Sequence, residues 1–236
     1  MKAHLFTLLL LLLIGTAQAQ IGFSGSYLSG NFTEFEDQLQ NTFELGPVNG
    51  QGLWQNGYKI GLDYWFRLKP VRIEFLPELG FSSFQSDLFE PTASSPLDSR
   101  FSSLHFQANI NIYPLDFVGD CDCPTFSKSE PIFQRGFFIQ IAPGIQYQSI
   151  IFNPDGNTRF AYDAFNYSLA GGIGLDIGIS DFITVTPYAK YWYFFEIDYA
   201  LANDFRPFER DPTELFVNGP ANQIEAGLRL GFRFDQ

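Results

Sequence analysis

Apolar and polar residues alternate over most of this chain, and the alternation constrains the fold more than any other feature of the sequence. In the segment 58–68 every second residue is Tyr, Ile, Leu or Phe, and Lys59, Asp63 and Arg67 lie among the residues between them. Successive side chains of a β-strand point to opposite faces of its sheet, so this period indicates a strand with one apolar and one polar face. Similar segments cover residues 21–29, 72–81, 104–112, 137–148, 167–177, 183–191 and 224–234. The sequence therefore predicts an all-β protein with eight amphipathic strands.

The ionisable side chains of these segments all fall on the polar face. They are Lys59, Asp63, Arg67, Arg72, Glu74, Glu78, His105, Asp176, Lys190, Glu225, Arg229 and Arg233. A soluble barrel of the lipocalin type would turn the apolar face inward and expose these charges to water. A membrane barrel turns the apolar face to lipid and the charges into its lumen. The alternation alone fits both architectures.

Three further features favour the membrane barrel. Glycines share the polar face with the charges, and the lumen of an eight-stranded barrel is narrow enough for side chains to fill it. Short connections such as Ser180-Asp181 alternate with long ones of roughly 15 to 25 residues, as in barrels with short periplasmic turns and long outer loops. The last segment ends in Phe232-Arg233-Phe234, which resembles an outer-membrane assembly signal. We therefore predict an eight-stranded antiparallel up-and-down transmembrane β-barrel with long extracellular loops.

The first nineteen residues are typical of a secretory signal peptide. Lys2 precedes an apolar run from Leu5 to Ile14, and Ala17-Gln18-Ala19 forms the cleavage motif. The run is shorter than the roughly 20 residues that a membrane-spanning helix needs. We expect residues 1–19 to be removed and residues 20–236 to form a single, monomeric barrel domain in the bacterial outer membrane, in contact with lipid and lipopolysaccharide.

The stretch from Arg72 to Ser83 carries a Pro-Glu-Leu-x-(Tyr/Phe)-Ser pattern, here Pro77-Glu78-Leu79-Gly80-Phe81-Ser82. With this pattern and its eight segments, the chain resembles the small outer-membrane barrels of OmpA type and, in particular, the PorT-like barrels of Bacteroidota. The resemblance implies the barrel and its location. It also implies, by analogy alone, an accessory role in secretion or assembly. The chain departs from the family in a long, cysteine-containing connection on the periplasmic side.

The charge balance bears on partners and on the lumen. The chain has 14 Lys and Arg against 26 Asp and Glu, a net charge of −12, which argues against a nucleic-acid partner. On the polar face the cations and carboxylates nearly balance, and unpaired buried charges are costly. We expect the lumen charges to pair with one another in a closed polar core. The alternative is an ion pathway or a gate.

His105 is the only histidine after the signal peptide, and it falls on the polar face. Lipid- and peptide-cleaving barrels need a base beside a nucleophile, and no second element of such a triad is evident at a suitable spacing. We therefore expect no catalytic site and no cofactor. The alternative is an enzyme that uses His105.

Cys121 and Cys123 lie in the long periplasmic connection, within Asp120-Cys121-Asp122-Cys123-Pro124. An exported pair of cysteines is expected to be oxidised, either locally or to a partner protein. A metal site with the two aspartates, or two free thiols, remain alternatives, although zinc prefers wider ligand spacings, and we expect no metal. This turn is the best candidate for docking a periplasmic partner.

The loops at about 32–55 and 197–219 combine acidic residues with aromatic ones. The aromatic residues are Phe32, Phe35, Phe43, Trp54, Phe205, Phe208 and Phe216. Such a rim would bind divalent cations or a surface partner, or be merely solvated. Together these features predict a non-enzymatic structural or accessory membrane platform. The alternative of another class is a small receptor or transport barrel that binds a ligand at its outer loops.

Overall fold

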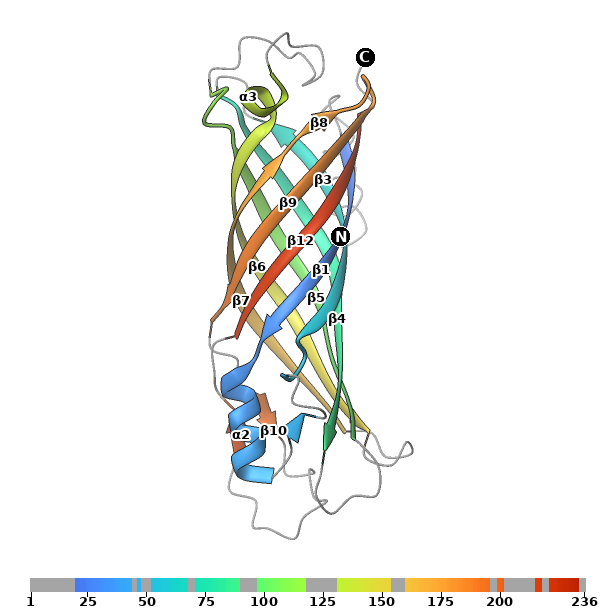
Figure 1. Cartoon of the computed structure of the whole chain (residues 1–236), viewed down its shortest axis with the longest axis vertical. Coiled ribbons are helices and arrows are strands. Elements are labelled where there is room, and N and C mark those ends of the chain that lie inside the picture. Colours follow the sequence, from blue (N-terminus) through green and yellow to red (C-terminus); the bar gives the residue numbers. More distant parts are fainter. Residues whose placement is uncertain are drawn as a thin grey trace, which may run out of the picture.

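A computed structural model describes residues 20–43, 46–47, 52–67, 71–89, 97–117, 131–153, 160–195, 199–201, 215–217 and 221–233. Within these ranges eight long strands form the wall of a barrel (Figure 1). They are β1 (Gln20–Asn31), β3 (Asn56–Arg67), β4 (Ile73–Phe89), β5 (Leu97–Ile112), β6 (Phe137–Asn153), β7 (Phe160–Leu175), β9 (Ile183–Phe194) and β12 (Ala221–Arg233). Neighbouring strands pair antiparallel, and β12 pairs with both β9 and β1, which closes the barrel. The predicted fold class is confirmed.

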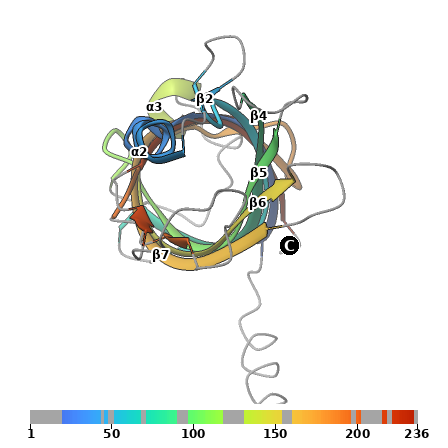
Figure 2. The ribbon, with the colours of Figure 1, turned by 90° about the horizontal axis from the view of Figure 1, so that it is seen from below.

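Short elements lie at the two ends of the barrel. They are α2 (Thr33–Phe43), β2 (Gly46–Pro47), α3 (Ile132–Gly136), β8 (Ile177–Gly178), β10 (Tyr199–Leu201) and β11 (Leu215–Val217). Figure 1 places α2 and β10 at one end, where the long outer connections lie, and α3 and β8 at the other. Seen along the axis, the strands form a closed ring (Figure 2). Among the described residues, no helix has the length and apolar character needed to cross a bilayer.

The wall rises further on one side than the alternation predicts. Strand β4 continues to Phe89 and β5 begins at Leu97, so only residues 90–96 connect them, where the sequence predicts a long loop. Beyond Phe81 the outward side chains of β4 become polar, at Ser83 and Gln85, while the inward Phe84 is buried. The polarity of the two faces thus inverts, and the period-two signal of the lower strand is lost. The long connections between β1 and β3 and between β9 and β12 are confirmed.

The outer surface of the wall is apolar along the middle of the barrel. Lys59 is 3% exposed, whereas its neighbour Ile60 is 58% exposed, and the same contrast repeats around the wall. On β6 the run from Phe137 to Tyr147 rises about 25 Å along the axis at the usual strand tilt, which matches the apolar band of outer-membrane barrels. Lys59 and its inward neighbours therefore face a lumen, and the apolar face meets lipid.

Prolines interrupt the strand ladder at three outward positions in the half of the barrel nearer the periplasm. The β3–β4 ladder skips Pro77, the β5–β6 ladder skips Pro143, and the β7–β9 ladder breaks beside Pro187. Each proline stays paired with the strand on its other side. Proline has no N–H to donate, and lipid offers no replacement donor. We therefore expect each of these three strand pairs to form a less stable seam, or line of backbone hydrogen bonds, than the uninterrupted pair β1–β12.

Replacing Pro143 by valine is expected to stabilise the barrel. The new N–H can bond to β5, and we expect the free energy of unfolding to rise by about 1 kcal/mol. Denaturant titration in lipid vesicles measures this change. Ile145→Val, on the same strand and face, is the control and should leave the midpoint nearly unchanged. An unchanged midpoint for Pro143→Val would show that the skipped position does not weaken the seam.

Candidate functional site in the barrel lumen

A buried ion-pair cluster fills the middle of the lumen. Lys59 Nζ lies 3.0 Å from Glu78 Oε1 and 3.1 Å from Glu225 Oε1. Glu225 is fully buried and accepts further hydrogen bonds from Trp192 Nε1 at 2.7 Å and from Tyr188 OH at 2.9 Å. Every oxygen of this carboxylate thus has donors in the barrel wall, and the charge is held without bulk water.

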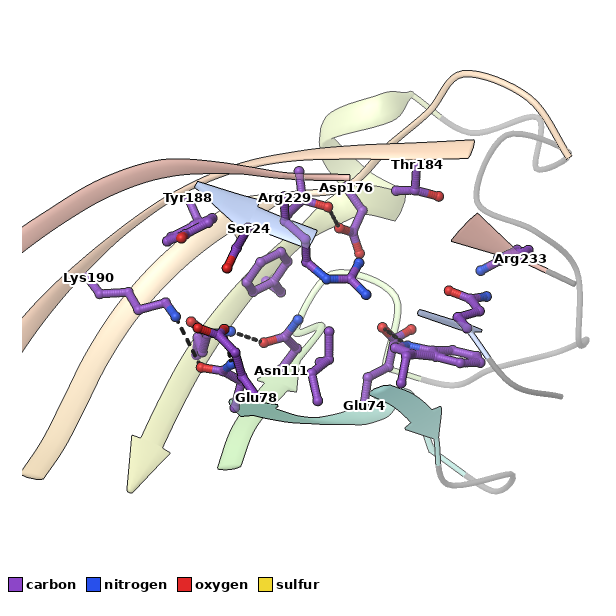
Figure 3. A pocket seen from close by; sticks show the side chains of 17 residues that line it. Ser24, Glu74, Glu78, Asn111, Asp176, Thr184, Tyr188, Lys190, Arg229 and Arg233 are labelled. Atoms are coloured by element: carbon purple, nitrogen blue, oxygen red, sulfur yellow. Dashed lines mark hydrogen bonds between the residues drawn. The ribbon is translucent and has the colours of Figure 1, made fainter. Parts of the chain in front are cut away.

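Lys190 joins this cluster through an amide. Its Nζ donates to Asn109 Oδ1 at 3.0 Å, and Asn109 Nδ2 donates to Glu78 Oε2 at 2.9 Å. The ammonium also lies 4.7 Å from the centre of the Tyr188 ring, within the range of a cation–π contact. Figure 3 shows Lys190 and Glu78 approaching each other from different sides of the wall.

A second ion pair, between Asp63 and Arg229, lies in the lumen nearer the periplasm. Arg229 donates to the two carboxylate oxygens at 2.8 and 2.6 Å, a bidentate geometry. Asp63 belongs to β3 and Arg229 to β12, so the pair passes over β1, which lies between them. At that point β1 has Gly22, where a Cβ atom would lie 2.4 Å from both Asp63 Oδ2 and Arg229 Nη2. The glycine is needed because the ion pair occupies the space of a side chain.

Arg72 and Tyr113 close the periplasmic end. The Arg72 guanidinium bonds to the Asp116 carboxylate and stacks on the Tyr113 ring, 3.9 Å from its centre. Tyr113 OH donates to Glu74 Oε2 at 2.8 Å and also bonds to Asp176. These contacts join three separate periplasmic connections to the barrel floor.

An apolar plug closes the outer end. Phe32, Phe35, Leu53 and Trp54, from the connection between β1 and β3, pack among inward side chains of the wall such as Phe101. The Trp54 indole donates to Ser99 Oγ at 3.1 Å. Trp54 has φ 49°, a left-handed conformation that non-glycine residues rarely adopt. The burial of the indole compensates for the cost of that conformation.

The plug corrects the predicted role of the first outer loop. Phe32, Phe35 and Trp54 are assigned by the sequence to an exposed acidic and aromatic rim, but all three are buried inside the barrel. Glu36 is half-buried, and its carboxylate accepts a hydrogen bond from the Leu53 backbone at 2.9 Å. The side chains of Phe43, Phe205, Phe208 and Phe216 lie outside the described residues. These three aromatic residues are therefore not available to bind a ligand at the outer loops, as the alternative of a receptor or transport barrel requires.

Small cavities lie between the described polar side chains of the lumen. One, of about 30 Å³, is lined by Glu78, Lys190, Arg229 and Asp176 among others (Figure 3). Another, of about 20 Å³, lies beside Lys59 and His105. Volumes of this size hold roughly one or two water molecules. Neither has room for an organic ligand.

The structure brings most of the predicted site residues together. Lys59, Asp63, Arg72, Glu74, Glu78, Asp176, Lys190, Glu225, Arg229 and Arg233 all lie on the inner face. The side chain of Arg67 and both Cys121 and Cys123 lie outside the described residues. Among the described residues, no group of three or more His, Cys, Asp and Glu is arranged to hold a metal ion.

His105 is buried on the inner face beside Glu78. Its Nε2 lies 3.8 Å from Glu78 Oε1, which is too long for a hydrogen bond. Ser82 and Ser103, its nearest hydroxyl neighbours along the two strands, bond to each other at 2.8 Å. A Cβ at Gly80 would lie 2.3 Å from His105 Nε2, so the glycine makes room for the ring.

Comparison with known proteins shows the fold. No protein-family model matches the sequence, and no curated protein matches it. The chain is similar to a major outer membrane protein from Thermus thermophilus, with 9% identity, 93% of this chain and 100% of that chain covered, and a TM-score of 0.50. It is also similar to OprG from Pseudomonas aeruginosa (12% identity, 93% and 97% covered, TM-score 0.45) and to Neisserial surface protein A (9%, 90% and 96%, 0.45).

The class of protein follows from these observations together. The wall is closed, its outer face is an apolar band of membrane thickness, and its inner face is polar, with buried ion pairs. The chain is an eight-stranded β-barrel of the bacterial outer membrane.

Removing the central cation is expected to destabilise this barrel strongly. Lys59→Met leaves Glu78 and Glu225 buried without their shared partner, which costs about 3–5 kcal/mol in unfolding free energy. Denaturant titration in vesicles measures the loss. The double variant Lys59→Met/Glu225→Gln should recover part of it, whereas Arg100→Gln, at an exposed outward position of β5, should change little. If Lys59→Met unfolds like the parent, the cluster does not hold the barrel together.

Because ion pairs occupy the lumen and apolar side chains close its outer end, we also expect the barrel not to conduct ions. In planar bilayers the purified protein should give negligible ion conductance at neutral pH, because both ends of the lumen are occupied by side chains. A reproducible, steady open channel would contradict this expectation and favour the ion-pathway alternative.

Proposed function

We propose that this protein is a non-enzymatic platform of the outer membrane. In this role a sealed, monomeric barrel in contact with lipid and lipopolysaccharide holds its periplasmic turn and outer loops in place for a protein partner. The observation that carries the proposal is the filling of the lumen, in which Lys59 forms ion pairs with Glu78 and Glu225 and aromatic side chains pack the outer end. Such an interior stabilises the barrel, so that interactions with partners would take place at the outer surfaces of its two ends.

The periplasmic connection between β5 and β6 supports a docking role. Its first part, Tyr113–Phe117, is fixed by the Arg72–Asp116 ion pair and by a hydrogen bond from the Arg72 backbone to the Phe117 carbonyl at 3.0 Å. Its last part, α3, is fixed by a hydrogen bond from the Asp176 backbone to the Gly136 carbonyl at 2.9 Å. In sequence the cysteine segment lies between these two attached parts. A docking element with fixed ends loses less conformational entropy when it binds.

The resemblance to PorT-like barrels adds a finer proposal, an accessory role in secretion or assembly. It rests on the Pro77–Ser82 motif and on the barrel architecture, and it is an argument by analogy.

His105 contributes to this function only as part of the polar core, because its ring is buried next to Glu78.

Purification of the tagged protein from its native outer membrane in mild detergent tests the platform role. We expect a stoichiometric protein partner to copurify, and we expect replacement of residues 120–124 by a Gly/Ser segment to remove it. The matched control replaces residues 154–158, in the outer connection between β6 and β7, and should retain the partner. A barrel that copurifies with no protein in either form would contradict the platform role.

A further inference from the structure

Large apolar side chains remain exposed at the periplasmic end of the barrel, beyond the first residues of the strands. Ile132 and Phe133 of α3 are 45% and 61% exposed, and Ile179 and Phe182 in the turn between β8 and β9 are 64% and 48% exposed. Short periplasmic turns are ordinarily polar, and exposed apolar groups of this size in water are unfavourable. These four side chains are called the apolar turn residues below.

Helix α3 is attached to the outside of the wall. The Phe133 ring stacks on Phe137 with 5.2 Å between ring centres and 22° between ring planes. Phe137 begins the outward column of β6 that continues with Ile139 and Ile141, both 45% exposed. Phe133 therefore extends the lipid-facing column by one more ring.

The close approach of α3 to the wall fixes its orientation. A Cβ at Gly136 would lie 2.3 Å from the Asp176 carbonyl oxygen, so the end of the helix contacts the junction of β7 and β8. The Arg135 carbonyl also accepts a hydrogen bond from the Arg72 guanidinium. With its polar end held against the barrel floor, the helix keeps Phe133 on the outer side.

The turn between β8 and β9 continues the outward apolar surface in the same way. Ile177 pairs with Val185 across the ladder, and the Ile179 backbone bonds to the Ile183 carbonyl at 2.9 Å. The pairing therefore reaches nearly to the tip of the turn. Ile179 is thus outward by the alternation of its strand, two positions beyond Ile177.

The height of these residues matches the membrane interface. The apolar band from Phe137 to Tyr147 already spans about 25 Å, the full thickness expected of an outer-membrane barrel. One further turn of chain at its periplasmic edge lies at the boundary between acyl chains and headgroups. Aromatic and branched aliphatic side chains are stabilised there, as in the girdles of membrane barrels and in interfacial helices.

We propose that the apolar turn residues form a lipid anchor, which lies in the periplasmic leaflet of the membrane and contacts its phospholipids. The occupant is the lipid, because these side chains are continuous with the lipid-facing surface of β6 and β9. The anchor does not depend on the platform role. It assigns α3 to the membrane, so that a periplasmic partner would engage other parts of the connection.

Tryptophan fluorescence in vesicles tests the anchor directly. The three native tryptophans, Trp54, Trp65 and Trp192, are all buried in the lumen, so a new indole at Phe133→Trp or Ile179→Trp reports on its own surroundings. In phosphatidylcholine vesicles, we expect lipids brominated near the headgroup to quench either variant strongly relative to the parent. Aqueous iodide should quench both only weakly.

Two control positions bracket the expected result. Leu169→Trp, at an exposed position that pairs with Pro143 near the middle of the band from Phe137 to Tyr147, should be quenched by lipids brominated deep in the acyl region. Gln85→Trp lies at an exposed outward position above the membrane and should respond to iodide alone. If Phe133→Trp and Ile179→Trp behave like Gln85→Trp, the anchor is wrong and the surface faces the periplasm, where a protein would cover it.

A second measurement uses the unaltered protein, so its result does not depend on whether the tryptophan variants fold. The parent in vesicles that contain a photoactivatable phospholipid should be labelled in the peptide around residues 132–137 after illumination. Absence of label there, with label on the outward residues of β6, would overturn the anchor. No partner protein is present in these vesicles, so the result is independent of the copurification experiment.

Discussion

The fold depends on the closure of β1 against β12. The two strands pair over their whole length, from Gln20 with Arg233 to Asn31 with Asn222. In a bilayer no water is available for backbone N–H and C=O groups, and each unpaired group costs several kcal/mol. Joining the first strand to the last removes both edges of the sheet. Closure then leaves only two environments for side chains, the lipid outside and a narrow lumen inside.

The narrow lumen determines how its charges are arranged. A charged side chain that points into so narrow a lumen is removed from bulk water, so its partner comes from a nearby strand of the wall. Asp63 and Arg229 belong to strands that do not pair with each other, and their ion pair passes over the intervening strand at Gly22. Lys59 reaches Glu225 in the same way. Gly22 and Gly61 therefore leave the space that the ion-paired side chains occupy.

Alternation along the chain was sufficient to predict eight strands and their two faces, but not the extension of β4 and β5. The choice of a membrane barrel also needed the glycines of the polar face, the loop lengths and the final aromatic residues. It was also sufficient to place Lys59, Glu78 and Glu225 in one lumen. It did not give their partners, because contacts inside the lumen depend on strand register and, for Lys59 and Glu225, on strands that are distant in sequence. Nor did it predict the plug. Phe32 and Trp54 stand in an acidic segment without period two, and only the closed mouth of the barrel makes burial there favourable.

The two ends of the lumen are sealed by different forces, and this difference bears on function. At the outer end the seal is apolar and comes from the β1–β3 connection, through Phe32 and Trp54. At the periplasmic end it is polar, with Arg72 and Tyr113 joining three connections. An apolar plug is stable because its rings are removed from water, so its outer surface can vary with little effect on the seal. The Arg72 contacts instead tie the seal to the positions of the turns themselves. Because these contacts connect the three periplasmic turns to one another, we expect the periplasmic end to present one preformed surface.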